Sequence, residues 1–136
     1  MVAGYHPEVI FFDPVFMRLE GARAAAMWQM LCGRAKDLEI TFSNVRADDQ
    51  TGAAHWEALY TFSKTGRKVH NRIDAAFAFK DGRIIQHTDT FNLWRWAAMA
   101  LGPTGLLFGW TPVVQSAIRK DARRSLEAFI LKQEVR

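Results

Sequence analysis

The sequence predicts a single α+β domain over residues 1–136, a cone-shaped α+β barrel in which a strongly curved antiparallel sheet and helices surround a cavity. Two observations lead to this prediction. Four strand-like stretches separated by short turns occupy residues 38–91, which is the pattern of an antiparallel meander. Helical periodicity precedes that block and follows it, so strands and helices are segregated along the chain, as in α+β folds.

A short hairpin and a helix open the chain. The apolar run 9–12 ends at Asp13-Pro14, a stop signal, and residues 15–19 can return beside it as a second strand. Gly21 then starts a helix that ends at about Gly33. The apolar side chains of this helix recur at spacings of three and four residues: Ala24, Met27, Trp28 and Leu31.

The meander consists of four predicted strands, at 38–45, 54–62, 69–79 and 83–91. In the first strand the alternation of apolar and polar residues breaks near Asn44. Turns rich in Asp, Gly, Ser and Thr separate the strands at 48–52, 63–66 and 80–82. The last turn contains Asp-Gly, which favours the left-handed conformations of a tight hairpin, so consecutive strands are expected to pair as antiparallel neighbours.

Two further helices are expected after the sheet. Asn92 can cap a helix over 93–101, and Pro112 suits the first turn of a last helix that runs to about Leu131. The 23 residues 96–118 contain no charge and no histidine, which is the length of a membrane span. Glycines and prolines interrupt this stretch, so it is predicted to form a helix, a loop and a helix instead.

Composition restricts the function classes. With 18 basic and 14 acidic residues the net charge is +4, a mild excess that does not indicate nucleic-acid binding. A single cysteine, Cys32, excludes an internal disulfide and a cysteine-built zinc site. No secretory leader is visible in the first residues, and a cytoplasmic location is the simplest interpretation. Aromatic residues make up 12%, enough for a large aromatic core or an aromatic-walled cavity.

Side chains alternate along a strand, so each predicted strand has two faces. Aromatic, small and polar residues gather on one face of the second and fourth strands: Trp56, Ala58, Tyr60, His87, Asp89 and Phe91. The third strand has an apolar face that includes Phe77, and an opposite face with ionisable side chains: His70, Arg72 and Asp74. Either this charged face joins the others around the cavity, or it is solvated and the Phe77 face forms the core.

Carboxylates are the side chains through which such a cavity would act. In apolar surroundings their pKa values rise, so they can work as general acids, or as bases near neutral pH. Asp74 and Asp89 would be such groups if both face inward, whereas an ion pair between Asp74 and Arg72 would be purely structural. No spacing of His and Asp residues requires a metal, and we expect neither a metal nor a cofactor.

Two segments resemble a known family. Residues 5–15 read Tyr-His-Pro-Glu-Val-Ile-Phe-Phe-Asp-Pro-Val, and residues 73–85 read Ile-Asp-Ala-Ala-Phe-Ala-Phe-Lys-Asp-Gly-Arg-Ile-Ile. Both are similar to segments of the nuclear-transport-factor-two-like superfamily, which includes ketosteroid isomerases, SnoaL-like polyketide cyclases and limonene epoxide hydrolases. The resemblance spans about residues 5 to 92 and implies the cone-shaped fold with a cavity for a small molecule.

The resemblance implies roles for particular residues. Asp13, in Asp-Pro-Val, matches the general base that moves a proton between carbon atoms in the isomerases. Asp74 matches the protonated acid that donates a hydrogen bond to the dienolate oxygen, a carboxyl kept neutral by an apolar site. Asp89 is similar instead to the aspartate that activates water in the epoxide hydrolases. There an Arg-x-Asp pair completes the site, and here Arg72 and Asp74 form such a pair, one strand later than in the family.

The chain departs from the family at both ends. The one or two helices that precede the position of Tyr5 in the family are absent. The tyrosine of the isomerase oxyanion hole lies in that missing part, and Tyr60 could substitute for it. Residues 93–136 form a C-terminal helical extension that is longer than the isomerase tail. We expect these helices to cover the mouth of the cavity.

We therefore expect a small-molecule enzyme that uses cofactor-free aspartate acid-base chemistry on an apolar ligand bearing a carbonyl or an epoxide. In the isomerase version Asp13 takes the proton and Asp74 stabilises the enolate. In the hydrolase version Asp89 activates water, while Arg72 and Asp74 position the ligand and protonate it.

The alternative is a non-catalytic ligand-binding or dimerisation module. The expected partners are a small apolar molecule and a second copy bound through the sheet, without nucleic acid. Membrane-surface contact through 106–110 and the basic helix after it is a third, less favoured interpretation.

Overall fold

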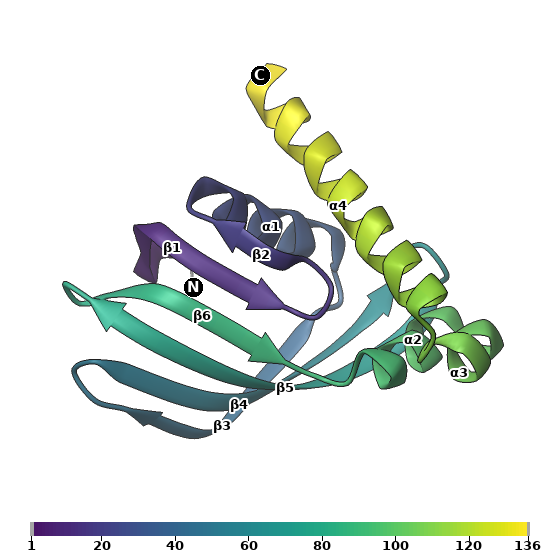
Figure 1. The fold of residues 1–136 in the computed structure, drawn as a ribbon, viewed down its shortest axis with the longest axis horizontal. Coiled ribbons are helices and arrows are strands. Elements are labelled where there is room, and N and C mark those ends of the chain that lie inside the picture. Colours follow the sequence, from purple (N-terminus) through teal and green to yellow (C-terminus); the bar gives the residue numbers. More distant parts are fainter. Residues whose placement is uncertain (1, 136) are drawn as a thin grey trace.

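One curved, unclosed sheet of six strands forms the centre of the computed structural model, which describes residues 2–135 (Figure 1). The strands lie in the order β2-β1-β6-β5-β4-β3 and have these bounds: β1 Tyr5–Asp13, β2 Met17–Glu20, β3 Glu39–Ala47, β4 Thr51–Phe62, β5 Arg67–Lys80 and β6 Arg83–Thr90. The predicted antiparallel meander is confirmed as β3 to β6. The predicted hairpin is confirmed as β1 and β2, and it extends the sheet because β1 pairs in parallel with β6.

Two local irregularities set the register of the meander. Asn44 has φ 51°, in the left-handed region that Asn adopts more readily than most residues, and the β3–β4 register shifts between Ser43 and Arg46. The β5–β6 hairpin turns at Asp81 and Gly82, with φ 54° and 73°, the positive values that Asp-Gly favours. Because a shift of one residue reverses the face of every side chain, these turns decide which residues reach the concave face.

The helices surround the sheet at its concave side and at one end (Figure 1). Within the described residues they have these bounds: η1 Val2–Gly4, α1 Ala22–Arg34, α2 Leu93–Leu101, α3 Pro103–Phe108 and α4 Pro112–Val135. Asn92 Oδ1 accepts a hydrogen bond from the Arg95 backbone N–H at 3.0 Å, so the predicted cap of α2 is confirmed.

The loop predicted between α2 and α4 is wrong, because α3 occupies most of it. Pro103 lies in the first turn of α3, where its missing N–H is not needed. A Cβ at Gly105 would lie 1.9 Å from the carbonyl oxygen of Ala97, so this glycine lets α3 pack directly against the backbone of α2. The contact between the two helices outweighs the weak helix propensity of glycine.

Helix α4 lies beside α1 and across the open side of the curved sheet (Figure 1). Polar contacts tie it to α1, to the β4–β5 turn and to the β1–β2 turn: Arg23 pairs with Glu127, Lys64 pairs with Asp121, and Arg119 Nε donates to Pro14 O at 2.9 Å. Ile118 and Leu126, on the apolar side of this helix, are buried. The helix is therefore held against the rest of the protein by buried apolar side chains and by ion pairs.

The largest buried side chains hold α1, β1 and α4 together. Phe11, Met27 and Leu126 have no exposed surface and belong to one apolar cluster. Within residues 2–135 no helix has both the length and the hydropathy that a bilayer crossing requires. The uncharged stretch 96–118 is divided among α2, α3 and the first turns of α4.

Candidate functional site

A cavity of about 1020 Å³ lies between the concave face of the sheet, α1 and α4. Its wall is mainly apolar and includes these large side chains: Trp28, Phe42, Trp56, Ile73, Phe91 and Ile118. Seven residues of α4, from Val113 to Ser125, line it. The C-terminal helix α4 therefore lies on the cavity side of the sheet, while its expected role as a cover of the cavity mouth stays a prediction.

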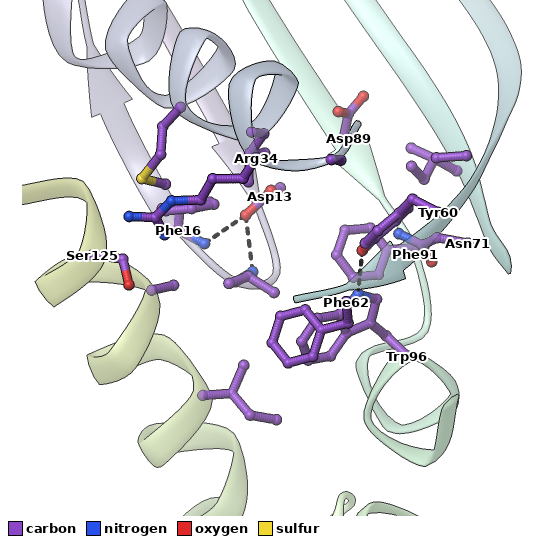
Figure 2. Close-up of a pocket in the computed structure, with 18 of the residues that line it drawn as sticks. Asp13, Phe16, Arg34, Tyr60, Phe62, Asn71, Asp89, Phe91, Trp96 and Ser125 are labelled. Atoms are coloured by element: carbon purple, nitrogen blue, oxygen red, sulfur yellow. Dashed lines mark hydrogen bonds between the residues drawn. The ribbon is translucent and has the colours of Figure 1, made fainter. Parts of the chain in front are cut away.

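Four polar side chains reach the interior of the cavity from four strands: Asp13 of β1, Tyr60 of β4, Asn71 of β5 and Asp89 of β6. Asp13, Asn71 and Asp89 are buried, and Tyr60 is mostly buried. Figure 2 shows Asp13 on one side of the space, with Tyr60, Asn71 and Asp89 on the other. The remaining polar side chains of the wall are exposed or partly exposed, so these four define its inner end.

Asp13 is a buried carboxyl at the end of β1. Its Oδ1 accepts hydrogen bonds from the backbone N–H groups of Val15 at 2.9 Å and Phe16 at 2.6 Å, because the chain turns at Pro14 (Figure 2). Burial raises the pKa of Asp13 to about 7; the two N–H donors oppose this, and the charge of Asp89 adds to it. Asp13 can therefore take up or release a proton near neutral pH.

Asp89 lies at the end of a buried chain of hydrogen bonds. Its Oδ1 accepts from His87 Nε2 at 2.8 Å and from Trp56 Nε1 at 3.3 Å. Behind it, Tyr5 Oη lies 2.7 Å from His87 Nδ1 and accepts from Trp28 Nε1 at 2.7 Å. If Tyr5 donates its hydroxyl proton to Nδ1, His87 is neutral and donates from Nε2 to Asp89. This single tautomer of His87 thus fits both of its hydrogen bonds, to Tyr5 and to Asp89, and holds the Asp89 carboxylate in place.

At the inner end of the cavity, Tyr60 and Asn71 are the hydrogen-bond donors that remain unused. Tyr60 Oη accepts from Trp96 Nε1 at 2.9 Å, and its own proton has no acceptor among the described residues (Figure 2). Burial raises the pKa of Tyr60, so its hydroxyl stays protonated. The Asn71 amide is 7% exposed and bonds to no side chain or backbone group of residues 2–135. Both groups are therefore available to a ligand.

The structure places three of the predicted site residues outside the cavity. The Asp74 side chain is 81% exposed and accepts a hydrogen bond from His55 Nδ1 at 2.9 Å. Arg72 and His70 are also exposed, and both contact Glu57 on the same outer face. The prediction that these charged side chains face the cavity is wrong, and the solvated alternative is confirmed.

Strand pairing explains this reversal. Residues directly opposite each other in a ladder point to the same face, and the structure pairs Trp56 with Ile73 and Asp89 with Ala75. Because Trp56 and Asp89 point inward, Ile73 and Ala75 do as well, and the intervening Asp74 points outward. A shift of β5 by one residue would therefore turn Asp74 toward the cavity.

The other predicted pocket residues lie at the cavity or directly behind it. Trp56, Ala58, Tyr60 and Phe91 line it, whereas His87 is fully buried behind the wall and is hydrogen-bonded to Asp89. Asn71 was not predicted. Its signal in the sequence is a single amide in the otherwise apolar row of β5. Within residues 2–135 no three His, Cys, Asp or Glu side chains are grouped as metal ligands would be.

A curved sheet that surrounds a cavity and is packed against helices is the nuclear-transport-factor-two-like fold. The particular family follows from the sequence. A family model for the SnoaL-like domain matches residues 1–87, and the chain belongs to that family.

Solved structures share this fold at low sequence identity. An NTF2-like protein of unknown function from Cytophaga hutchinsonii is 13% identical, with a TM-score of 0.57 over 67% of this chain and 81% of that one. A protein from Catenulispora acidiphila with a ketosteroid isomerase-like fold, in complex with trimethylamine, is 11% identical, with a TM-score of 0.64 over 82% and 84%. An LEH-like epoxide hydrolase from M. tuberculosis is 20% identical, with a TM-score of 0.61 over 79% and 80%. No protein of curated function matches the chain.

Proposed function

We propose that this protein is a small-molecule enzyme that moves a proton between carbon atoms of an apolar carbonyl compound, with Asp13 as the base. The observation that supports this most directly is the position of Asp13: a buried carboxyl with a pKa of about 7 in the wall of a large apolar cavity. An ordinary exposed aspartate is a far weaker base. Catalytic bases work best when their pKa lies near the working pH.

In the proposed reaction, ionised Asp13 removes a proton from the carbon next to the carbonyl group. The electron pair left on that carbon moves to the carbonyl oxygen, which becomes an enolate. Asp13, now protonated, returns the proton to another carbon of the conjugated system, so no atom is gained or lost. The carboxylate is regenerated for the next turnover.

The enolate oxygen needs hydrogen-bond donors, and Tyr60 and Asn71 are the two unused donors at the inner end of the cavity. The Trp96 indole donates to the Tyr60 oxygen, which strengthens Tyr60 as a donor in turn. This arrangement replaces the role that the family resemblance implied for Asp74. Loss of one such donor lowers turnover by about 10²- to 10³-fold.

Asp89 serves the proposed reaction through its charge. It lies close enough to Asp13 to raise the pKa of that carboxyl, and the His87 and Trp56 donors hold it in place. The hydrolytic alternative is less well supported, because Arg72 and Asp74, which it requires beside Asp89, lie on the exposed outer face.

The test uses a polycyclic ketone with a β,γ double bond, whose conversion to the conjugated isomer is followed by ultraviolet absorbance. Asp13→Asn should lower kcat by about 10²- to 10⁴-fold, and Tyr60→Phe by about 10²-fold. Asp48→Asn is the matched control, because Asp48 Oδ1 also accepts from two backbone N–H groups but is exposed and far from the cavity wall.

A polycyclic phenol, which mimics the enolate, gives a second readout by fluorescence titration. Both variants should still bind the phenol, Tyr60→Phe more weakly, if only chemistry has been removed. Full turnover by Asp13→Asn would refute the proposal. Tight phenol binding by a wild-type protein that isomerises no ketone would favour the non-catalytic ligand-binding module instead.

A further inference from the structure

An exposed cluster of apolar side chains lies outside the cavity, around α3. We call it the apolar tip, and it consists of six residues that expose 45 to 79% of their surface: Trp94, Leu106, Leu107, Phe108, Trp110 and Val113. Figure 1 shows α3 at one end of the molecule, beside α2 and the start of α4. Contiguous apolar clusters on the surface of a soluble protein mark interaction sites.

The apolar tip is a packed structure and not a loose loop. The indole N–H groups of Trp94 and Trp110 donate to the carbonyl oxygens of Leu106 at 2.9 Å and Leu107 at 3.0 Å. Both polar edges are thus satisfied within the tip, while the rings remain accessible. Gly105 lets α3 lie against α2 without space for a side chain between them. The apolar side chains are therefore presented in a fixed arrangement.

The charge around the apolar tip is mainly basic, and the nearest acidic residue in sequence, Asp121, is paired with Lys64. Residues 91–120 contain no Asp and no Glu, whereas they contain Arg95, Arg119 and Lys120. Arg95 and Lys120 are exposed. Arg67, also exposed, donates from Nε to the Met99 carbonyl at 2.9 Å, at the base of the tip. An apolar surface flanked by an excess of basic groups is complementary to an anionic lipid surface.

The apolar tip is continuous with the mouth of the cavity. Val113 belongs to both, and Leu101 and Thr104, which flank the start of α3, line the cavity too. A molecule that leaves a bilayer at the tip would therefore meet residues of the cavity wall close by. This arrangement suits an apolar ligand that partitions into membranes.

We propose that the apolar tip docks this protein on the surface of a bilayer that contains anionic lipid, with the cavity mouth at the membrane. A second copy of the chain fits the tip less well. A two-fold contact through the tip would bring the same basic rim from each copy together, which like charges oppose. The proposal does not depend on the chemistry inside the cavity.

The test measures flotation of the full-length protein with vesicles of phosphatidylcholine, with and without phosphatidylserine. Binding should be at least about tenfold stronger with phosphatidylserine and should weaken as salt is added. Leu107→Glu should lower vesicle binding by about tenfold or more. Leu131→Glu is the matched control, because Leu131 is 60% exposed and Leu107 is 61% exposed, but Leu131 lies near the far end of α4.

A second readout uses vesicles with brominated lipid, which quench tryptophans that enter the bilayer surface. Quenching in wild type that is lost in Leu107→Glu and kept in Leu131→Glu supports docking through the tip. Absence of binding to phosphatidylserine vesicles, or binding that Leu107→Glu does not weaken, overturns the proposal. It is also overturned if wild type ignores vesicles and sediments as a dimer that Leu107→Glu dissociates, because the tip then joins two copies.

Discussion

Replacement of Asp13 by Asn should stabilise the protein at alkaline pH while it removes the proposed activity. The change substitutes an amide of the same shape for a carboxyl that is 8% exposed. The amide oxygen can keep both hydrogen bonds from the backbone N–H groups of Val15 and Phe16. What changes is the charge, which the folded protein must bury when the carboxyl is ionised.

The size of the effect follows from the pKa. Asp13 titrates near 3.8 in the unfolded chain and at about 7 in the folded protein. Between these values the folded state holds a proton that the unfolded state has released, so stability falls as the pH rises. At about 1.4 kcal/mol for each tenfold change in proton affinity, the full loss is about 4 kcal/mol, complete above about pH 7.

Urea denaturation at about pH 4 and about pH 8 measures this effect, because the two proteins differ only in the Asp13 titration. At the lower pH both folded proteins have a neutral side chain at position 13, and their free energies of unfolding should agree to within about 0.6 kcal/mol. At the higher pH Asp13→Asn should be more stable than wild type by up to about 4 kcal/mol. A gap of the same size at both pH values would show that the pKa of the Asp13 carboxyl is not raised.

Asp48→Asn provides a control of opposite sign. Asp48 makes the same pair of bonds with the backbone N–H groups of Gln50 and Thr51, but it is exposed, and these donors lower its pKa. Its ionised form is therefore favoured in the folded state, and that contribution is present at neutral pH and is lost as the pH falls. Stability should thus decrease in Asp48→Asn at pH 8, where it increases in Asp13→Asn.

Three further predictions concern the site and the fold. The kcat/KM of wild type should rise with pH to a plateau above an inflection near pH 7, because Asp13 must be ionised to act; a profile flat through that range would contradict its role. Asp74→Asn should keep turnover within about twofold, because its side chain is 81% exposed on the outer face; a tenfold loss would return it to the site. Gly105→Ala should lower the thermal stability by at least about 2 kcal/mol, because the new Cβ would overlap the Ala97 carbonyl. Gly33→Ala, with open space around it, should instead raise the stability by up to about 1 kcal/mol, and equal effects of the two changes would contradict the packing of α3.

The elements of the sheet could be predicted because their signals are local. Asp81-Gly82 requires two positive φ values, and the break near Asn44 is a bulge within β3, so the sequence itself specifies where the ladder turns and shifts. The helix α3 could not be predicted in this way. Its glycines and proline indicate a loop, and only the close contact of Gly105 with α2 makes the helix favourable.

The candidate site could be predicted only in part, because alternation along a strand defines two faces without saying which is the inner one. For β5 the motif favoured the Asp74 face, and the pairing of Trp56 with Ile73 reverses it. Asp13 and Asp89 were predicted and do line one cavity. Asn71 was missed because a lone amide in an apolar row has no chemical meaning until the row is known to face a cavity.

Asp13 lowers the stability of the folded protein and is the base of the proposed reaction. A protein selected for stability alone would gain by exchanging this carboxyl for an amide, because its neighbours Val15 and Phe16 offer an amide oxygen the same two hydrogen bonds. Moreover, the second buried carboxylate, Asp89, makes ionisation of Asp13 harder, although packing alone does not require two acids in one apolar cavity. Tyr60 and Asn71 add donors that bind nothing within residues 2–135. The cavity thus combines a buried acid with a raised pKa, a second carboxylate that raises this pKa further, and two unused hydrogen-bond donors. Together these groups favour proton transfer over simple binding, because a binding site would need only the donors.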